Sequence, residues 1–162
     1  QVPTAQLLIV GDGPAREDLE QQAKDAQLMD HVTFTGEIDN YEFFRYYPMA
    51  NVFLSSSDPE SQGSTFIEAM AAGTKIVVMT SPYTDELLSS RTLGVTFTTQ
   101  DELVENVVDY LLHGDDEQDP DLLAQKLAEI SADTFGQHIN EFYQDAQVSY
   151  EESHEDTPDF TD

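Results

Sequence analysis

Cysteine is absent from this chain of 162 residues, which excludes disulfide bonds, thiolate nucleophiles and cysteine-based zinc sites. Basic residues are scarce, because six lysines and arginines stand against 33 aspartates and glutamates, for a formal net charge of −27. Phosphate backbones and anionic lipids are bound mainly by basic side chains. The charge balance therefore argues against nucleic-acid binding and against direct membrane binding by these residues.

Long hydrophobic runs are also lacking, so the sequence predicts no membrane span, and residues 1–10 lack the pattern of a signal peptide. The first residue is Gln1 and not Met, so we expect a processed chain or a piece of something longer. The absence of cysteine is compatible with a reducing compartment, and we expect a cytoplasmic protein.

Apolar residues make up 39% of the chain and include nine Phe and seven Tyr, enough for one domain with a real core. We place this domain at residues 1–150. Residues 151–162 consist mainly of acidic residues with Ser, Pro and Thr, a composition typical of a disordered tail.

Short apolar runs alternate with amphipathic stretches at intervals of roughly 20–25 residues, a pattern typical of βαβ units. The predicted strands are residues 6–10, 31–35, 52–54, 75–79 and 95–98. The first predicted helix has Pro14 at its first position and runs to about residue 28. The others are residues 40–49, a short helix closed by Gly73, and residues 85–90, 101–113, 121–130 and 133–148. This order predicts an α/β fold with a Rossmann-like parallel sheet covered by helices on both faces.

Ligands of such sheets bind beyond the carboxyl ends of the strands. Here these ends are expected to lie on one rim, in residues 11–14, 36–38, 55–64 and 80–83. Three of the four loops are rich in Gly, Ser, Thr or Pro, which let the backbone approach a ligand. None of them contains Lys or Arg.

The stretch from Ser55 to Val78, SSSDPESQGSTFIEAMAAGTKIVV, carries the strongest chemical signal. Glu60 is predicted in a polar loop and Glu68 in the helix closed by Gly73, so two acids flank a helix start. A helix start can hold an anion, and the acids can accept hydrogen bonds from hydroxyls. A ligand that offers both a phosphate to the helix start and sugar hydroxyls to the acids is a nucleotide sugar.

Each of these acids also has a simpler interpretation. Thr65 and Glu68 have the spacing of a capping box, in which Glu68 would only accept from the backbone at Thr65. Glu60, in an exposed loop, could be an ordinary solvated acid. The sequence alone leaves both alternatives open.

Other motifs are weaker. Gly11-Asp12-Gly13 resembles a dinucleotide fingerprint, but Arg16 occupies the position of the third glycine, which favours a plain tight turn. Asp119-Pro120-Asp121 follows a helix within an acidic run and not a strand, so we do not expect it to bind a metal. The four histidines are scattered and predict neither a metal site nor a general base.

Taken in order, the segments LLIVGDGP, VTFTG, YPMANVFLSSSDPESQGSTFIEAMAAG and SPYTDELL resemble the C-terminal, donor-binding half of the family 4 glycosyltransferases. These are retaining enzymes of GT-B architecture, with two Rossmann-like domains. The most specific match is the E-x7-E motif from Glu60 to Glu68. The ESQGSTFIEAM and SPYTDELL segments are most similar to the bacterial diacylglycerol glucosyltransferases.

The resemblance implies separate roles for the matching residues. Glu68 would bind the ribose hydroxyls of a UDP-sugar. Glu60, the expected catalytic residue, would lie by the transferred sugar, bind a ring hydroxyl and support charge at the reacting carbon. Three residues between them would present backbone N–H groups to the sugar and diphosphate: Gly63, Ser64 and Thr65. The uracil base would be lined by Gly36, Glu37 and Ile38. Neither a metal nor another cofactor is expected.

The implied activity is transfer of a hexose, with glucose expected, from a UDP-sugar to a lipid acceptor such as diacylglycerol. The resemblance also implies that this chain lacks the domain's first strand and helix, a diphosphate-binding Arg and Lys upstream of Gln1, and the N-terminal domain that binds the acceptor. The fragment alone should therefore be inactive, and the whole enzyme peripheral at the inner face of the membrane. The alternatives are a non-catalytic glycosyltransferase-like partner subunit and an unrelated Rossmann-type nucleotide-binding domain.

Overall fold

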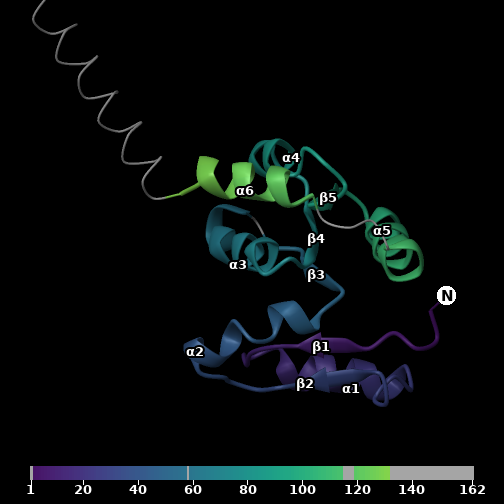
Figure 1. Ribbon diagram of the computed structural model, residues 1–162. Helices are drawn as coiled ribbons and strands as arrows, with labels where there is room; N and C mark the ends of the chain where they lie inside the picture. The colour runs from purple at the N-terminus through teal and green to yellow at the C-terminus, as the bar shows by residue number, and fades with distance from the viewer. Residues whose placement is uncertain (1, 58, 115–118, 132–162) are drawn as a thin grey trace, which may run out of the picture. The chain divides into compact units, whose positions relative to one another are not determined.

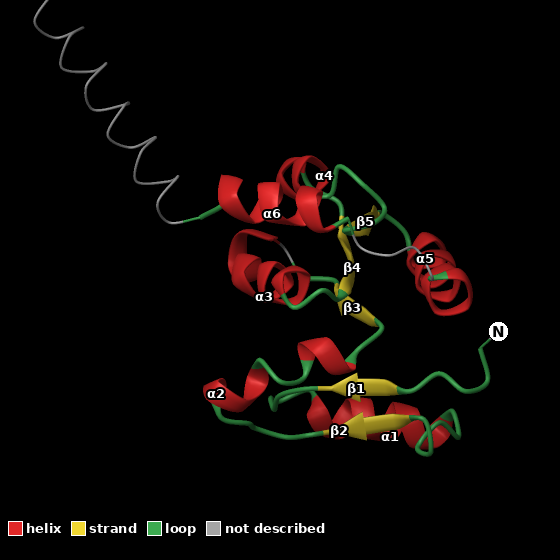
Figure 2. Ribbon diagram, viewed as in Figure 1, coloured by secondary structure: helices red, strands yellow, loops and turns green. Residues whose placement is uncertain are grey.

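The computed structural model describes residues 2–57, 59–114 and 119–131. Strands and helices alternate along the chain, as Figures 1 and 2 show. The strands are β1 (Leu7–Ile9), β2 (Val32–Phe34), β3 (Val52–Ser55), β4 (Lys75–Met79) and β5 (Gly94–Phe97). The helices are α1 (Arg16–Asp25), α2 (Asn40–Phe43), the short 3₁₀ helix η1 (Tyr47–Met49), α3 (Pro59–Ala71), α4 (Pro82–Leu87), α5 (Gln100–His113) and α6 (Pro120–Glu129).

The chain divides into two compact units, residues 1–119 and 120–162. The first unit holds all five strands and every helix from α1 to α5. In the second unit only α6 and the two residues after it are described. The predicted helix at 133–148 and the predicted disordered tail at 151–162 lie outside the described residues.

The main sheet of the first unit is three-stranded and parallel, with β4 paired to β3 on one side and to β5 on the other. A strand buried on both faces needs a continuous apolar run, and β4 provides one: Ile76 and Val77 have no exposed surface. Both α3 and α5 contact β4, and Figure 2 shows them on opposite sides of this sheet. Val77 packs with Phe97 and with Tyr110 of α5, so the core of the unit lies here.

The second sheet contains only β1 and β2, also paired in parallel, with Leu8 opposite Thr33. Its apolar side chains are poorly covered, since Leu7 is 49% exposed and Leu8 is 40% exposed. Beyond the two strands the chain continues in an isolated bridge between Gly11 and Gly36. The carboxyl ends of β1 and β2 are therefore held side by side.

The predicted α/β class with parallel strands is confirmed, but the strands form two sheets and not the expected single one. Among the described residues, β1 pairs only with β2, and β3 only with β4. The four strand ends are consequently arranged as two pairs. The ends of β1 and β2 adjoin each other, and so do those of β3 and β4.

Three helix predictions need correction. The predicted helix at 40–49 is split into α2 and η1, because Pro48 lacks the N–H that an α-helix would need there. The helix predicted at 85–90 is α4, which begins at Pro82 because the Ser81 side chain accepts from the backbone N–H of Thr84 in a capping box. The third correction, the start of α3, concerns the site and is described below.

None of the helices in the described part of the chain is both long and apolar enough to cross a membrane. Within the same residues, acidic and histidine side chains form no group of three that could hold a metal ion.

Candidate functional site

The turn between β1 and α1 is fixed against the end of β2. Gly11 has a φ of +121°, a conformation that favours glycine, and its N–H donates to Thr35 Oγ1 at 3.2 Å. The N–H of Gly13 donates to Asp12 Oδ1 at 2.7 Å. The Asp12 carboxylate therefore lies at the same sheet edge as the backbone of the turn, next to Gly36.

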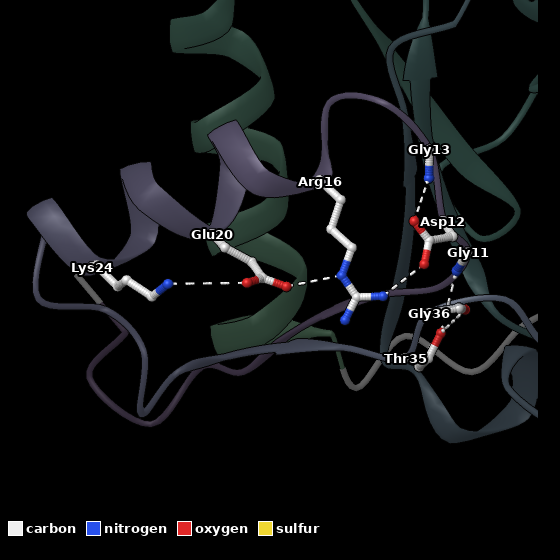
Figure 3. A network of polar contacts seen from close by, with 8 residues as sticks. All are labelled: Gly11, Asp12, Gly13, Arg16, Glu20, Lys24, Thr35 and Gly36. Atoms are coloured by element: carbon white, nitrogen blue, oxygen red, sulfur yellow. Dashed lines mark hydrogen bonds and ion pairs between the residues drawn. The ribbon is translucent and has the colours of Figure 1, made fainter.

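A chain of ion pairs runs from this turn along α1, as Figure 3 shows. The Arg16 guanidinium donates from Nη1 to Asp12 Oδ2 and from Nε to Glu20 Oε1, both at 2.8 Å. The hydrogen bond from Arg16, followed by that from the Gly13 N–H, lowers the pKa of Asp12. The hydrogen bonds to Glu20 and then Asp12 raise the pKa of Arg16, which stays charged.

The sequence interpretation missed Arg16 as a residue of this edge. A Cβ added to Gly36 would lie 2.9 Å from Arg16 Nη1, so the guanidinium comes close to the β2 end although Arg16 belongs to a helix. Its position is that of the third glycine of the fingerprint. The spacing of Asp12, Arg16 and Glu20, four residues apart on a helix start, is the signal that could have indicated the network.

A cavity of about 510 Å³ opens at the carboxyl ends of β1 and β2, within the size range of small-molecule sites. It is lined by Gly11, Asp12, Gly13, Glu37, Ile38 and Phe43. Two of the three residues predicted to contact a base, Glu37 and Ile38, line this cavity, and Gly36 lies beside it in the bridge to Gly11. The sequence interpretation did not single out Phe43, which lies at the end of α2.

The start of α3 differs from the prediction. The helix begins at Pro59, so Glu60 lies in its first turn and not in a loop. The unsatisfied N–H groups of a helix are those of its N-cap and first turn, and Pro59, the first residue of α3, has no N–H at all. Gly63, Ser64 and Thr65 lie further inside, so the argument that their N–H groups form a helix start is wrong. The side chains of residues 59–64 lie outside the described structure.

The same helix bounds exclude the capping-box interpretation of Glu68, because Thr65 lies inside α3 and not at its N-cap. The Glu68 carboxylate, half-buried, instead accepts a hydrogen bond from the Tyr47 hydroxyl, with 2.8 Å between Oη and Oε2. The predicted closure of the helix is confirmed. Gly73 has a φ of +83°, and its N–H donates to the Met70 carbonyl oxygen at 3.0 Å.

The β4 end lies close to α3 through aromatic contact. Tyr83, in the first turn of α4, has its ring centroid 6.1 Å from that of Phe66, a buried residue of α3. Partial burial raises the pKa of Tyr83. The SPYTDELL segment thus packs on the helix that carries Glu68.

Comparison with known proteins adds the following findings. The family model described as "Glycosyl transferases group 1" matches residues 1–134. An alpha-monoglucosyldiacylglycerol synthase of Streptococcus pneumoniae is 37% identical over 143 residues, which cover 88% of this chain and 32% of the relative. A synthase of the same name from Acholeplasma laidlawii is 30% identical over 139 residues, covering 85% of this chain and 33% of the relative. The chain thus spans about a third of the length of these relatives.

Solved structures with the same fold include a sucrose-phosphate synthase of Thermosynechococcus elongatus, with a TM-score of 0.74 and 24% identity over 92% of this chain and 40% of that one. Another is the Anabaena protein HepE in complex with UDP-glucose, with a TM-score of 0.71 and 20% identity over 89% of this chain and 42% of that one. These neighbours are GT-B glycosyltransferases, so the predicted architecture is confirmed.

Proposed function

The chain belongs to the group 1 glycosyl transferases, and on that premise we propose that it is the donor-binding part of a retaining enzyme that transfers glucose from a UDP-sugar to a lipid acceptor such as diacylglycerol. The relatives that share 37% and 30% identity are named as monoglucosyldiacylglycerol synthases, which supports the glucose donor and the lipid acceptor. The fold neighbour crystallised with UDP-glucose supports a UDP-linked donor.

The observation that carries the proposal is the cavity at the ends of β1 and β2. Its lining combines the residues of the Gly11–Gly13 turn, a second acidic residue, Glu37, and two apolar residues, Ile38 and Phe43. A flat heterocycle with polar edges needs this mixture of apolar walls and a few hydrogen-bonding groups. We therefore assign the uracil of the donor to this cavity, with Glu37 and Ile38 in its wall and Gly36 beside it.

The remaining roles follow the chain away from the cavity. Glu68 accepts hydrogen bonds from the ribose hydroxyls. Glu60, in the first turn of α3, binds the transferred sugar and supports positive charge at its reacting carbon. Gly63, Ser64 and Thr65 remain our proposed contacts to the sugar and diphosphate, although their place inside α3 means that they do not act through free helix-start N–H groups. The proposed reaction uses no metal.

A diphosphate leaving group also needs positive charge. Arg16 lies at the edge of the cavity, but its guanidinium is already shared between Asp12 and Glu20. We propose that the compensating Arg and Lys come from outside this chain. The acceptor and the membrane are likewise contacted from outside it, because a net charge of −27 repels an anionic lipid surface.

The break between the two sheets supports a further part of the proposal, namely that the domain is completed by one more strand. Doubly wound sheets have the order 3-2-1-4-5-6. The observed orders β2-β1 and β3-β4-β5 fit this series with its first strand left out between β1 and β3. An apolar parallel strand in that position would cover Leu7 and Leu8 and join the two sheets.

The donor role is tested by titrating the isotope-labelled chain with UDP and following amide shifts by NMR. Shifts should concentrate in residues 11–13, 36–38 and 43. Glu68→Ala should weaken binding by roughly ten- to a hundredfold, because hydrogen bonds to a charged group are lost. Glu105→Ala, which removes an exposed glutamate of α5 that does not line the cavity, is the control for loss of one acidic side chain and should leave UDP affinity unchanged. Equal UDP affinity in the Glu68→Ala variant and the native chain would rule out the ribose role.

A further inference from the structure

Tyr47 is a buried residue that connects two parts of the site described above. It opens the short helix η1 and is 4% exposed. Its ring meets that of Phe43 edge-on, with centroids 5.3 Å apart and planes at 80°, and meets that of Phe53 at 5.7 Å. Phe43 also lines the cavity. The Tyr47 ring is therefore packed directly behind a wall of the proposed base site.

The polar atoms of Tyr47 are tied to α3 and to the residue beyond its end. The hydroxyl donates to Glu68 Oε2 at 2.8 Å. The backbone carbonyl oxygen accepts from Thr74 Oγ1 at 2.6 Å, and Thr74 is only 3% exposed. With the ring held by neighbouring rings and the backbone held by Thr74, the hydroxyl has a fixed position relative to α3.

The direction of the Tyr47–Glu68 hydrogen bond is also fixed. Burial, and after it the hydrogen bond to Glu68 and the charge of that carboxylate, raises the pKa of Tyr47. The phenol therefore keeps its proton at physiological pH and acts as the donor. A carboxylate has lone pairs on two oxygens, so Glu68 can accept from Tyr47 and from a ligand hydroxyl at once.

We propose that Tyr47 is a positioning residue, which holds the Glu68 carboxylate in the orientation that accepts the ribose hydroxyls of the nucleotide. The proposal rests on the donor-binding function given above. Through its contact with Phe43, Tyr47 links the base cavity to the ribose acid, so the two halves of a nucleoside are recognised by one packed unit. Without the hydroxyl, the Glu68 side chain would sample other rotamers, and each hydrogen bond to ribose would first have to order it.

The test compares Tyr47→Phe with Tyr110→Phe, which is matched in burial and in the length of the hydrogen bond that its hydroxyl donates. Tyr110 is 6% exposed, and its hydroxyl donates at 2.8 Å to the Arg91 carbonyl oxygen, far along the chain from α3. Both variants lose one buried hydroxyl and keep the ring. Affinity for UDP and for 2′,3′-dideoxy-UDP, which lacks both ribose hydroxyls, is measured for each by NMR titration. Thermal unfolding records how much stability each variant loses.

The native chain should prefer UDP to the dideoxy analogue, and Tyr47→Phe should reduce that preference by roughly three- to tenfold, the scale of one net hydrogen bond. Tyr110→Phe should keep the preference even if its unfolding temperature falls as much. A Tyr47→Phe variant that binds both nucleotides more weakly by one common factor would overturn the positioning role and leave the donor-binding function standing. A native chain that binds no UDP would overturn both.

Discussion

The two sheets of the first unit are built from similarly apolar strands but differ sharply in burial. In β4, Ile76 and Val77 are fully buried, whereas in β1 Leu7 and Leu8 are close to half exposed. The difference follows from pairing together with helix cover, since β4 has a strand on each side and contacts both α3 and α5, whereas β1 has a strand on one side only. Hydrophobicity indicates which segments form strands, but the neighbouring strands and the covering helices decide which of them form the core.

The two sheets also divide the proposed work. The three-stranded sheet carries the packed core and supports α3, and with it Glu68. The two-stranded sheet carries the cavity. The edge of this sheet is held by the backbone bridge between Gly11 and Gly36 and by the ion pairs of Arg16. A stable scaffold next to a polar, weakly packed binding edge is the arrangement expected of a ligand site.

The largest effect that the comparison predicts is the difference in unfolding free energy between Ile76→Ala and Leu8→Ala. Truncating the fully buried Ile76 should cost about 2–5 kcal/mol of unfolding free energy, from lost burial and a cavity that cannot collapse. Leu8, 40% exposed, should cost less than about 1 kcal/mol. Urea unfolding followed by circular dichroism measures both.

The same pair tests the proposed additional strand. In a longer protein in which that strand lies beside β1, Leu8→Ala should become as costly as a core truncation, while the cost of Ile76→Ala should stay where it is. A Leu8→Ala cost above about 2 kcal/mol in the 162-residue chain itself would contradict the comparison, because it would show that β1 is already covered in solution.

A smaller effect is expected from Gly36→Ala at the edge of the two-stranded sheet. Gly36 has a φ of +74°, which a residue with a Cβ adopts at a cost of about 1–2 kcal/mol. The new methyl would also meet Arg16 Nη1 at 2.9 Å, and the flexible guanidinium would have to move away from Asp12. Thermal unfolding and the NMR shifts of the cavity residues should both change.

Gly13→Ala is the matched control, since Gly13 does not have a positive φ and a Cβ there would meet nothing within 4 Å. Its effect should stay within about 0.5 kcal/mol. If both glycines tolerate alanine equally, the edge of the two-stranded sheet is not held by the conformation of Gly36.

Sequence pattern alone predicted β4 with its observed bounds, Lys75–Met79. A short, uninterrupted apolar run in a βαβ pattern is typical of a strand buried on both faces of a parallel sheet. The start of α3 was missed because Ser, Gln and Gly are typical of loops, and this composition outweighed Pro59, a residue favoured at the first position of a helix. The same signal, Ser81 followed by Pro82, was missed at α4.

The candidate site was predicted in part. The strand ends that carry Glu37 and Ile38 were placed correctly at a cavity, since this follows from parallel topology. Arg16 could have been found from its i, i+4 spacing to Asp12 and Glu20. Phe43 and the Tyr47–Glu68 hydrogen bond could not, because they depend on how α2 and η1 pack against the rest of the unit. Periodicity within one segment carries no information about contacts between residues 21 positions apart.

The smallest effect is expected from the ion pairs that Arg16 makes with Asp12 and Glu20 at the edge of the cavity. The pKa of Asp12 is lowered chiefly by the hydrogen bond from Arg16, so the pairing stabilises the fold above the unfolded-state pKa of about 4. That contribution is lost as the pH falls through the lower pKa of the folded state.

Arg16→Gln should therefore move the Asp12 pKa, followed by carboxyl ¹³C NMR, back up toward its ordinary value. The unfolding temperature at neutral pH should barely change, because exposed ion pairs contribute little. Lys24→Gln is the control, since Lys24 Nζ lies 4.0 Å from Glu20 and makes no contact with Asp12 in the network of Figure 3. An unchanged Asp12 titration in Arg16→Gln would assign the shift to the Gly13 N–H instead, and the edge of the two-stranded sheet would then be ordered by its turn alone.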